Sequence, residues 1–467
     1  MTLAEIAPLS ESEKTELLLA LWTEVQVLRA RHAELEAQVK ELAARLNQPA
    51  KDSHNSSVPP ARTQKANTPA SPPGQPRARR EAGVGRTGGG RALAADPDQF
   101  VVAKAGRCPE CGAPVDEAAQ RVHAVYDKIE WPPITPIITR VTQYGGECGH
   151  CGASYVAPVP VGLEAGTPLG RSIQALAVYL RYTRAISYER RAALLGDVFG
   201  LAISEGALAN LFQAVKPRLE AEVTRILERL RSSRLICSDE TSARVNGRTQ
   251  WEWVFQNPDV CVHLIRPSRG HGVIDEVFGT DQPKPAIWVS DLYSAQRQHP
   301  AEDWQVCLAH QLRDCQFALE AGDTVFAPGM KAVLLRAFVI HRWRDELSAA
   351  QLEAYRADLA RRVQRCLERQ PTNTPGQRLR KRYTQIKDHL FVFLRDASIP
   401  PTNNSSEQAI RMSTIFRKVT NGFRSDWGRD LFAAVRSVVN TGQRHGLSAY
   451  QAIKKIIGAN GSLFAPG

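Results

Sequence analysis

The pattern of hydrophobic positions changes along the chain, and its first clear period is a heptad in residues 14–46. Core positions recur at alternating intervals of three and four residues, which is typical of a parallel two-stranded leucine zipper. These positions are Leu18, Leu21, Val25, Leu28, His32, Leu35, Val39, Leu42 and Leu46, with His32 interpreted as a register-setting polar residue. The alternative is one amphipathic helix packed on its own protein. The polar segment that follows offers no such surface, which favours the coiled coil.

Residues 47–98 have no period and are rich in proline, glycine and arginine. Such a segment buries too little apolar area to offset its ordering entropy, so the sequence predicts a disordered basic linker. Its arginines either contact DNA phosphates or stay solvated, and the sequence leaves both interpretations open.

Helical periodicity returns in residues 168–231. The sequence predicts one helix, a turn at Gly200 and a second helix capped by Ser204. Two helices joined in this way form a helix-turn-helix, whose second helix enters the major groove in many DNA-binding proteins. Glu205 and Asn210 would then follow Ser204 at the start of the groove-facing helix. A helical hairpin without any contact to DNA is an equal alternative.

From residue 232 the period changes again, to short apolar strands. Three strands are followed by a helix, a strand, a helix, a strand and a helix, an order typical of a ribonuclease-H-like α/β fold. In that fold the first and fourth strands lie side by side. The sequence therefore predicts a catalytic domain over residues 232–430, with a helical insertion at about 318–398 and a C-terminal helical tail at 431–467. The expected fold class is multidomain α+β.

Two of these strands end in aspartate, at Asp239 and Asp291. Because open α/β sheets form their sites at the carboxyl ends of strands, we expect both side chains in one site. Side chains alternate along a strand, so Glu240 should face away from the direction of Asp239. Adjacent carboxylates bind magnesium or manganese, and two such ions about 3.5–4 Å apart stabilise both oxygens at a reacting phosphorus. The sequence therefore predicts two catalytic metal ions and no nucleotide cofactor.

A third carboxylate, Glu407, lies in the segment P-P-T-N-N-S-S-E-Q-A-I-R-M. The prolines and Asn404, the expected cap, indicate the start of a helix. Glu407 has two interpretations, a third catalytic carboxylate or the glutamate of a capping box. The basic run that follows suits a phosphate backbone, and its DNA-binding candidates are Arg411, Arg417, Lys418 and Arg424.

The charge balance agrees with a polyanionic partner. The 467 residues carry 60 lysines and arginines against 48 aspartates and glutamates, a formal net charge of +12. Cationic surface gains free energy by releasing counterions from phosphates, although charge alone does not distinguish nucleic acid from an anionic membrane. The first residues do not form a secretory signal, and no long apolar run predicts a membrane span. We expect a cytoplasmic bacterial protein that associates with the nucleoid when it binds DNA.

Nine cysteines, an odd number, fit a reducing compartment better than a disulfide framework. Four of them form two C-x2-C pairs in the segment 99–160, which we interpret as a zinc-ribbon DNA-binding module. The spacing lets four thiolates bind one structural zinc, and the glycine after each pair favours a tight turn. The predicted ligands are Cys108, Cys111, Cys148 and Cys151. For Cys307 and His310, a structural role and, at His310, an assisting role in catalysis both stay open.

Together these segments resemble transposases of insertion-sequence family 66, specifically the large subunit with an Asp-Asp-Glu catalytic set. The resemblance covers nearly the whole chain. Its specific parts are the two cysteine pairs, D-E-T at Asp239, V-S-D-L-Y at Asp291, C-L-A-H at Cys307 and N-N-S-S-E-Q-A-I-R at Glu407. The resemblance implies that Asp239, Asp291 and Glu407 bind the catalytic metal ions.

The resemblance also implies magnesium-dependent cleavage at transposon ends and strand transfer into target DNA. Double-stranded DNA is the expected partner, and the zipper predicts a homodimer or higher oligomer that brings two DNA ends together. Whether small accessory proteins of the same element take part is left open. The alternatives are a non-catalytic zinc-ribbon and helix-turn-helix regulator derived from a transposase, and a nuclease that cuts without joining. Departures from the family pattern, which indicate a divergent branch, occur at Leu292, Thr402, Leu308 and Leu312.

Overall fold

The computed structural model of the protein describes residues 8, 10–46, 48–49, 51, 92–131, 134–279, 285–458 and 461–464. Most of the predicted linker at 47–98 lies outside these residues. Within them the chain forms twelve α-helices, a two-stranded sheet and a five-stranded mixed sheet. The protein is therefore a mixed α/β protein, which confirms the coarse part of the predicted fold class. None of the helices in the described ranges is long and apolar enough to cross a membrane.

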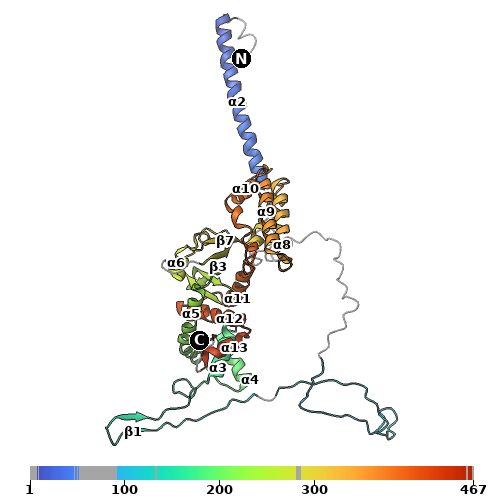
Figure 1. The fold of residues 1–467 in the computed structure, drawn as a ribbon, viewed down its shortest axis with the longest axis vertical. Helices are drawn as coiled ribbons and strands as arrows, with labels where there is room; N and C mark the ends of the chain where they lie inside the picture. Colours follow the sequence, from blue (N-terminus) through green and yellow to red (C-terminus); the bar gives the residue numbers. More distant parts are fainter. Residues whose placement is uncertain are drawn as a thin grey trace.

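Helix α2 (Glu11–Leu46) contains the predicted heptads (Figure 1). It begins at a capping box, in which the Ser10 N–H donates to Glu13 Oε2 at 2.8 Å and the Glu13 N–H donates to Ser10 Oγ at 3.4 Å. The apolar stripe is exposed at its described positions, and Leu18 and Val39 keep 67% and 64% of their surface. The stripe is therefore not packed on its own chain, which contradicts that alternative. Pairing with a second copy stays a prediction.

Residues 92–160 contain the two cysteine pairs and little regular structure. Strands β1 (Gly145–Glu147) and β2 (Ser154–Val156) form an antiparallel hairpin around the second pair. The glycine after each pair has a positive φ, 74° at Gly112 and 70° at Gly152, as the predicted tight turns require. In the described part of 115–144 the chain forms no strand, so regular ribbon structure is limited to β1 and β2.

The predicted helical region consists of α3 (Arg171–Tyr182), α4 (Tyr188–Phe199) and α5 (Glu205–Arg231). Gly200 ends α4 with a left-handed φ of 64°. At the start of α5 the Ser204 hydroxyl accepts a hydrogen bond from the Ala207 N–H at 3.1 Å. The predicted turn and cap are therefore confirmed. One flank of α5 packs against α12, and its first turn is exposed.

The five-stranded sheet has the order β5-β4-β3-β6-β7. Strands β3, β4 and β5 are antiparallel neighbours, whereas β6 pairs in parallel with β3 and β7 with β6. The first and fourth strands are thus adjacent, as the sequence predicted. The elements are β3 (Leu235–Val245), β4 (Arg248–Gln256), β5 (Cys261–Arg266), α6 (Gly272–Phe278), β6 (Ile287–Ser290) and β7 (Asp303–Val306).

Aromatic side chains hold the sheet against α6. Trp253, Phe255, Phe278 and Trp288 are buried, and neighbouring ring centroids lie 5.1–6.1 Å apart. Burial of each ring contributes roughly 2–3 kcal/mol. The Trp288 indole also donates to Ser238 Oγ at 2.7 Å, one residue before Asp239. The packed centre of the sheet therefore fixes the strand segment that carries the first predicted acid.

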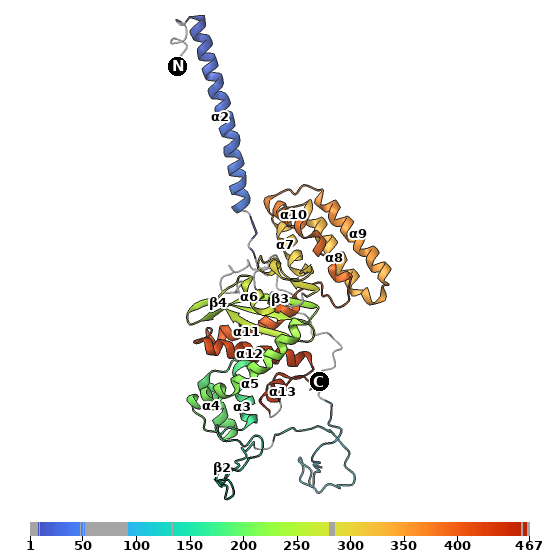
Figure 2. The ribbon, with the colours of Figure 1, turned by 60° about the vertical axis from the view of Figure 1, so that its left-hand side comes forward.

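Helices α11 (Asn404–Thr420) and α12 (Asp426–Arg444) lie along the sheet, α11 against β3 and β4 and α12 against β5. Helices α3, α5 and α13 (Ala449–Ile457) form a further layer against α12 (Figure 2). All residues from Leu431 to Gly442 are buried because α12 lies between the sheet and this layer. The segment predicted as a C-terminal helical tail is helical, and its first helix belongs to the main core.

The chain between β7 and α11 is mostly helical, as predicted for the insertion. Its helices are α7 (Leu308–Glu320), α8 (Phe326–Arg342), α9 (Ala349–Leu367) and α10 (Thr374–Ile386), and they lie together in Figure 2. Short 3₁₀ helices span Gln296–Gln298, Arg344–Glu346, Lys387–His389 and Val392–Leu394. Buried Asp323 starts α8, because its carboxylate accepts three backbone N–H groups of the first turn.

Candidate active site

Asp239 lies within β3 rather than at its end. The sequence predicted that the strand stops at this acid, but β3 continues to Val245 and turns into β4 through Asn246 and Gly247, both with positive φ. This two-residue turn extends the hairpin beyond the region where β3 pairs with β6. The acids therefore lie where the parallel pairing of β3 with β6 ends, and not where β3 itself ends.

Asp291 follows directly after β6 and is level with Asp239. Cys237 pairs with Val289 in the parallel register, and each aspartate comes two residues later. The Asp291 Oδ1 atom accepts a hydrogen bond from the Tyr293 N–H at 2.8 Å. The adjacency predicted from the strand order therefore brings the two carboxylates to the same edge of the sheet.

The electrostatics at this edge disfavour another negative charge. Burial, together with the charges of Glu240 and Asp291, raises the pKa of Asp239 well above its ordinary value. His310 acts in the opposite direction and favours the carboxylate. A cation bound between the aspartates would remove this penalty, so the site is suited to one.

Glu240 has a separate partner, as the alternation along β3 predicted. Its Oε1 atom accepts a hydrogen bond from Arg269 NH2 at 2.7 Å, and its Oε2 atom accepts one from Gln296 at 2.5 Å. The Arg269 guanidinium lies 3.7 Å from the centroid of the Tyr293 ring. Glu240 is therefore held in an ion pair and is less suited than Asp239 to bind a metal ion.

The start of α11 is fixed by Asn403, not by Asn404 as predicted. The Asn403 N–H donates to Cys307 Sγ at 3.2 Å, and its side-chain amide donates to the Ser238 carbonyl at 2.6 Å. Asn403 is thus bonded both to the loop before α7 and to β3 next to Asp239. These contacts join residues far apart in sequence, so no local signal could have indicated them.

Glu407 is not a capping-box residue. Its carboxylate points to α7, where Oε1 lies 3.4 Å from His310 Nε2 and 3.5 Å from Arg313 NH2. Both distances exceed those of good hydrogen bonds, and this buried oxygen has no hydrogen-bond partner. The structure therefore contradicts the capping interpretation and places this oxygen in ion pairs with α7, without a hydrogen bond. Sequence reasoning did not identify Arg313.

His310 interacts with all three acids, by contact with Glu407 and by charge with the two aspartates. It sits on α7, in contact with Glu407 and close enough to Asp239 and Asp291 for their charges to interact. Burial disfavours its charged form, but Cys307 and Asp291 outweigh this and raise the pKa of His310 to about 9. The imidazole is therefore a cation at neutral pH. The structure therefore places His310 against Glu407 and within electrostatic range of both aspartates, and the catalytic role of these residues stays a prediction.

The predicted ligands of the magnesium site and of the zinc site do not form complete metal-binding groups in the structure. Among the described residues, no three His, Cys, Asp or Glu side chains form a group that could already hold a metal ion. Each cysteine pair makes its turn, with the Cys108 N–H donating to the Ala113 carbonyl at 2.8 Å and the Cys148 N–H to the Ala153 carbonyl at 2.9 Å. The two pairs are not brought together, so the single zinc site stays a prediction.

The four basic candidates on and after α11 are not equivalent. Arg411, Lys418 and Arg424 are exposed, and Arg424 lines a cavity of about 280 Å³ together with Arg244. Arg417 instead bonds the hydroxyls of β3, with its NH1 3.3 Å from Ser242 Oγ. Arg417 therefore joins α11 to the sheet, and its predicted contact with DNA stays a prediction.

A comparison with known protein families shows to which family the chain belongs. The model of the Transposase IS66 family matches residues 166–430, more than half of the chain. The chain belongs to the IS66 transposase family. The matched region contains Asp239, Asp291, His310 and Glu407. A comparison with curated proteins found no match.

Proposed function

We propose that this IS66-family transposase is an active DDE enzyme that cleaves DNA at the ends of its element and joins them to target DNA. The observation that carries the proposal is the convergence of Asp239, Asp291 and Glu407 on His310, from a strand, a strand end and a helix. The strand order β5-β4-β3-β6-β7 supports a ribonuclease-H-like catalytic domain. Acids in this arrangement are suited to phosphoryl transfer.

The residues fit magnesium or manganese, two ions in the full site. All three acids offer hard oxygen ligands, the pKa of Asp239 is raised by burial and like charge, and a buried Glu407 oxygen lacks a hydrogen bond. When bound, the ions polarise the phosphodiester and activate water. Asp239 and Asp291 would hold them from adjacent strands, and Glu407 from α11. His310 and Arg313 orient the Glu407 carboxylate from α7.

The chemistry then takes two steps. Water attacks the phosphorus at the transposon end, the bond to the 3′ oxygen breaks, and that oxygen takes a proton. The freed 3′ hydroxyl attacks a target phosphodiester, and the target's own 3′ oxygen leaves. The exposed Arg411, Lys418 and Arg424 are suited to hold the DNA backbone beside this site. No nucleotide cofactor is needed for either step.

The N-terminal parts of the chain supply assembly in this proposal. The exposed apolar stripe of α2 supports a zipper-mediated dimer, which sedimentation of the full chain with and without Leu28→Glu would test. The two glycine-ended turns support one structural zinc bound by the four cysteines, which the zinc content of the purified protein would test. The exposed first turn of α5 supports a role in DNA reading.

The test is cleavage and strand transfer by the purified protein on DNA carrying its own element's ends, with magnesium. We expect Glu407→Gln to lose joined products by about a thousandfold or more while it still binds DNA. Glu228→Gln, which alters an exposed glutamate of α5, is the matched control and should retain activity.

Three other outcomes would contradict the proposal. Full activity of Glu407→Gln would remove this residue from the catalytic set. Cleavage without joined products would favour a nuclease. Specific binding of the ends without any cleavage by the wild-type protein would favour a DNA-binding regulator.

A further inference from the structure

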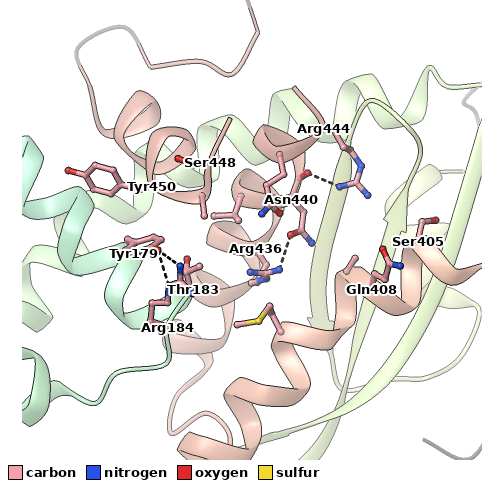
Figure 3. Close-up of a pocket in the computed structure, with 15 residues that line it drawn as sticks. Tyr179, Thr183, Arg184, Ser405, Gln408, Arg436, Asn440, Arg444, Ser448 and Tyr450 are labelled. Carbon is pink, nitrogen blue, oxygen red and sulfur yellow. Dashed lines mark hydrogen bonds between the residues drawn. The ribbon is translucent and has the colours of Figure 1, made fainter. Parts of the chain in front are cut away.

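A second cavity lies on the other side of α11, between α3, α12 and α13. Its volume is about 600 Å³, within the range of roughly 300–1,000 Å³ that small-molecule sites occupy. Figure 3 shows Tyr179 and Tyr450 at one end, Ser405 and Gln408 of α11 at the other, and Arg436 between them. The lining contains three arginines and no aspartate or glutamate. The cavity is therefore basic throughout.

Arg436 carries an unbalanced charge in the wall of this cavity. It is 3% exposed, donates from NH2 to Asn440 Oδ1 at 2.8 Å, and leaves its buried Nε without a hydrogen bond. Burial lowers the pKa of Arg436, whereas Glu252 and Cys261 raise it. Glu252 accepts hydrogen bonds from Ser413 and His263 through its Oε1 atom and forms no ion pair with Arg436 within 4 Å. A buried guanidinium without an ion pair is costly unless an anion binds it.

The other two arginines also lack a carboxylate partner. Arg444 donates from Nε to the Asn257 carbonyl at 3.0 Å and from NH1 to the Asn440 carbonyl at 2.6 Å. Arg184 donates from Nε to the Tyr179 hydroxyl at 2.8 Å. Neither forms an ion pair with a described residue within 4 Å. Arg444 also donates from NH2 to Gln256, so the three arginines line a space that supplies no negative charge, and only Arg436 leaves a buried nitrogen unbonded.

The rest of the lining is neither charged nor uniformly polar. The rings of Tyr179 and Tyr450 meet edge to face, with centroids 5.8 Å apart. Met412, Ala409 and Val439 add apolar surface, and the buried hydroxyl of Thr183 has no hydrogen-bond partner. The cavity is also too large for a bare phosphate. It suits a ligand with an anionic group and a ring.

We propose that the cavity between α3, α11, α12 and α13 binds a single nucleotide, with Arg436 on its phosphate and with Arg184, Tyr179 and Tyr450 beside its base. Such a ligand has two sources: a free nucleotide, or an unpaired nucleotide of bound DNA. Guanidinium groups bind phosphate through charge-assisted hydrogen bonds, and aromatic rings contact any base. The site lies outside the catalytic carboxylates, and its occupancy does not require that the protein cleaves DNA.

The test measures binding to the full chain by fluorescence anisotropy. One probe is a fluorescent nucleoside 5′-monophosphate, and the other is a labelled duplex with one unpaired terminal nucleotide, compared with the same duplex blunt. Arg184→Gln removes a charge at the exposed rim, and Gln443→Trp fills the cavity from an exposed position without removing charge. We expect each variant to weaken binding of the favoured probe about tenfold. Arg190→Gln, an exposed arginine outside the lining, is the matched control.

The probe that binds identifies the source. Tight binding of the monophosphate indicates a free nucleotide, and preference for the unpaired over the blunt duplex indicates a nucleotide of the DNA. The proposal is overturned if Arg184→Gln and Gln443→Trp bind both probes with the same affinity as Arg190→Gln. It is also overturned if blunt and unpaired duplexes lose affinity equally, because the arginines would then bind only backbone phosphate. Glu407→Gln should bind both probes like wild type, so loss of catalysis and loss of this site are separable.

Discussion

The two sides of α11 carry unbalanced charge of opposite sign. Toward α7 and β3, Asp239 and Asp291 share one edge of the sheet and Glu407 faces His310, and the pKa of Asp239 is raised by burial and by the carboxylates of Glu240 and Asp291. Toward α12, Arg436 and two further arginines line a cavity without a single carboxylate. Consecutive helix positions point about 100° apart, so one helix serves both sites. The proposals above assign a cation to the first side and an anion to the second.

Asp323 is a buried charge in the same protein whose hydrogen-bond partners are satisfied. Asp323 is fully buried, yet backbone N–H groups of Ala327, Phe326, Val325 and Thr372 donate to it. Burial opposes its charge, but these hydrogen bonds outweigh it and hold the pKa of Asp323 below its ordinary value. The difference from Asp239 teaches that burial alone does not mark a site. Buried charge without satisfied partners does.

The largest effect should come from Asp239→Asn. We expect cleavage to fall about a thousandfold or more, because an amide binds a divalent cation poorly. The same change should raise the free energy of unfolding of the metal-free protein by roughly 1 kcal/mol, because a disfavoured charge is removed. Cleavage assays and urea unfolding measure the two effects. Glu240→Gln is the control: burial and Asp291 also raise the pKa of Glu240, so this change should not lower stability, and it should keep most activity because Glu240 is held by Arg269 and Gln296.

Asp323→Ala should have the next largest effect and in the opposite direction. Loss of its backbone hydrogen bonds should lower the free energy of unfolding by about 2 kcal/mol, without a direct effect on the acids. The folded pKa of Asp323 is depressed, so its contribution is present above the ordinary value of about 3.9 and is lost as pH falls through the folded pKa. Urea unfolding at pH 7 and pH 3 measures this. A constant difference between wild type and variant at both values would contradict it.

Asn440→Asp should have the smallest effect on stability. It tests most directly whether the basic side of α11 lacks an anion. The new carboxylate would lie next to Arg436, which already donates to this position at 2.8 Å. We expect the free energy of unfolding to rise by about 0.5–1 kcal/mol and nucleotide binding to weaken, because the protein then supplies its own anion. Thermal unfolding and the anisotropy assay measure both. A lower free energy of unfolding together with unchanged nucleotide binding would show that the protein already compensates the positive charge of Arg436.

The elements that the sequence predicted correctly have local causes. The turn at Gly200 and the cap at Ser204 depend on backbone conformations that neighbouring residues alone determine. The adjacency of β3 and β6 follows from their order and period, and it brings Asp239 and Asp291 to one level. Errors occurred where a partner lies far away in sequence. Asn403 begins α11 because Cys307 and Ser238 hold it, and no local pattern distinguishes it from Asn404.

By itself, the sequence determined most of the helices and strands and which acids are candidates, because period, turn residues and spacing are properties of neighbouring positions. Only the tertiary structure decided the partners of those acids: His310 and Arg313 for Glu407, and Arg269 for Glu240. It alone decided that three arginines from two separate segments meet at one cavity. The physical reason is that the energy of a buried charge depends on everything packed around it, and that environment exists only once distant segments have come together.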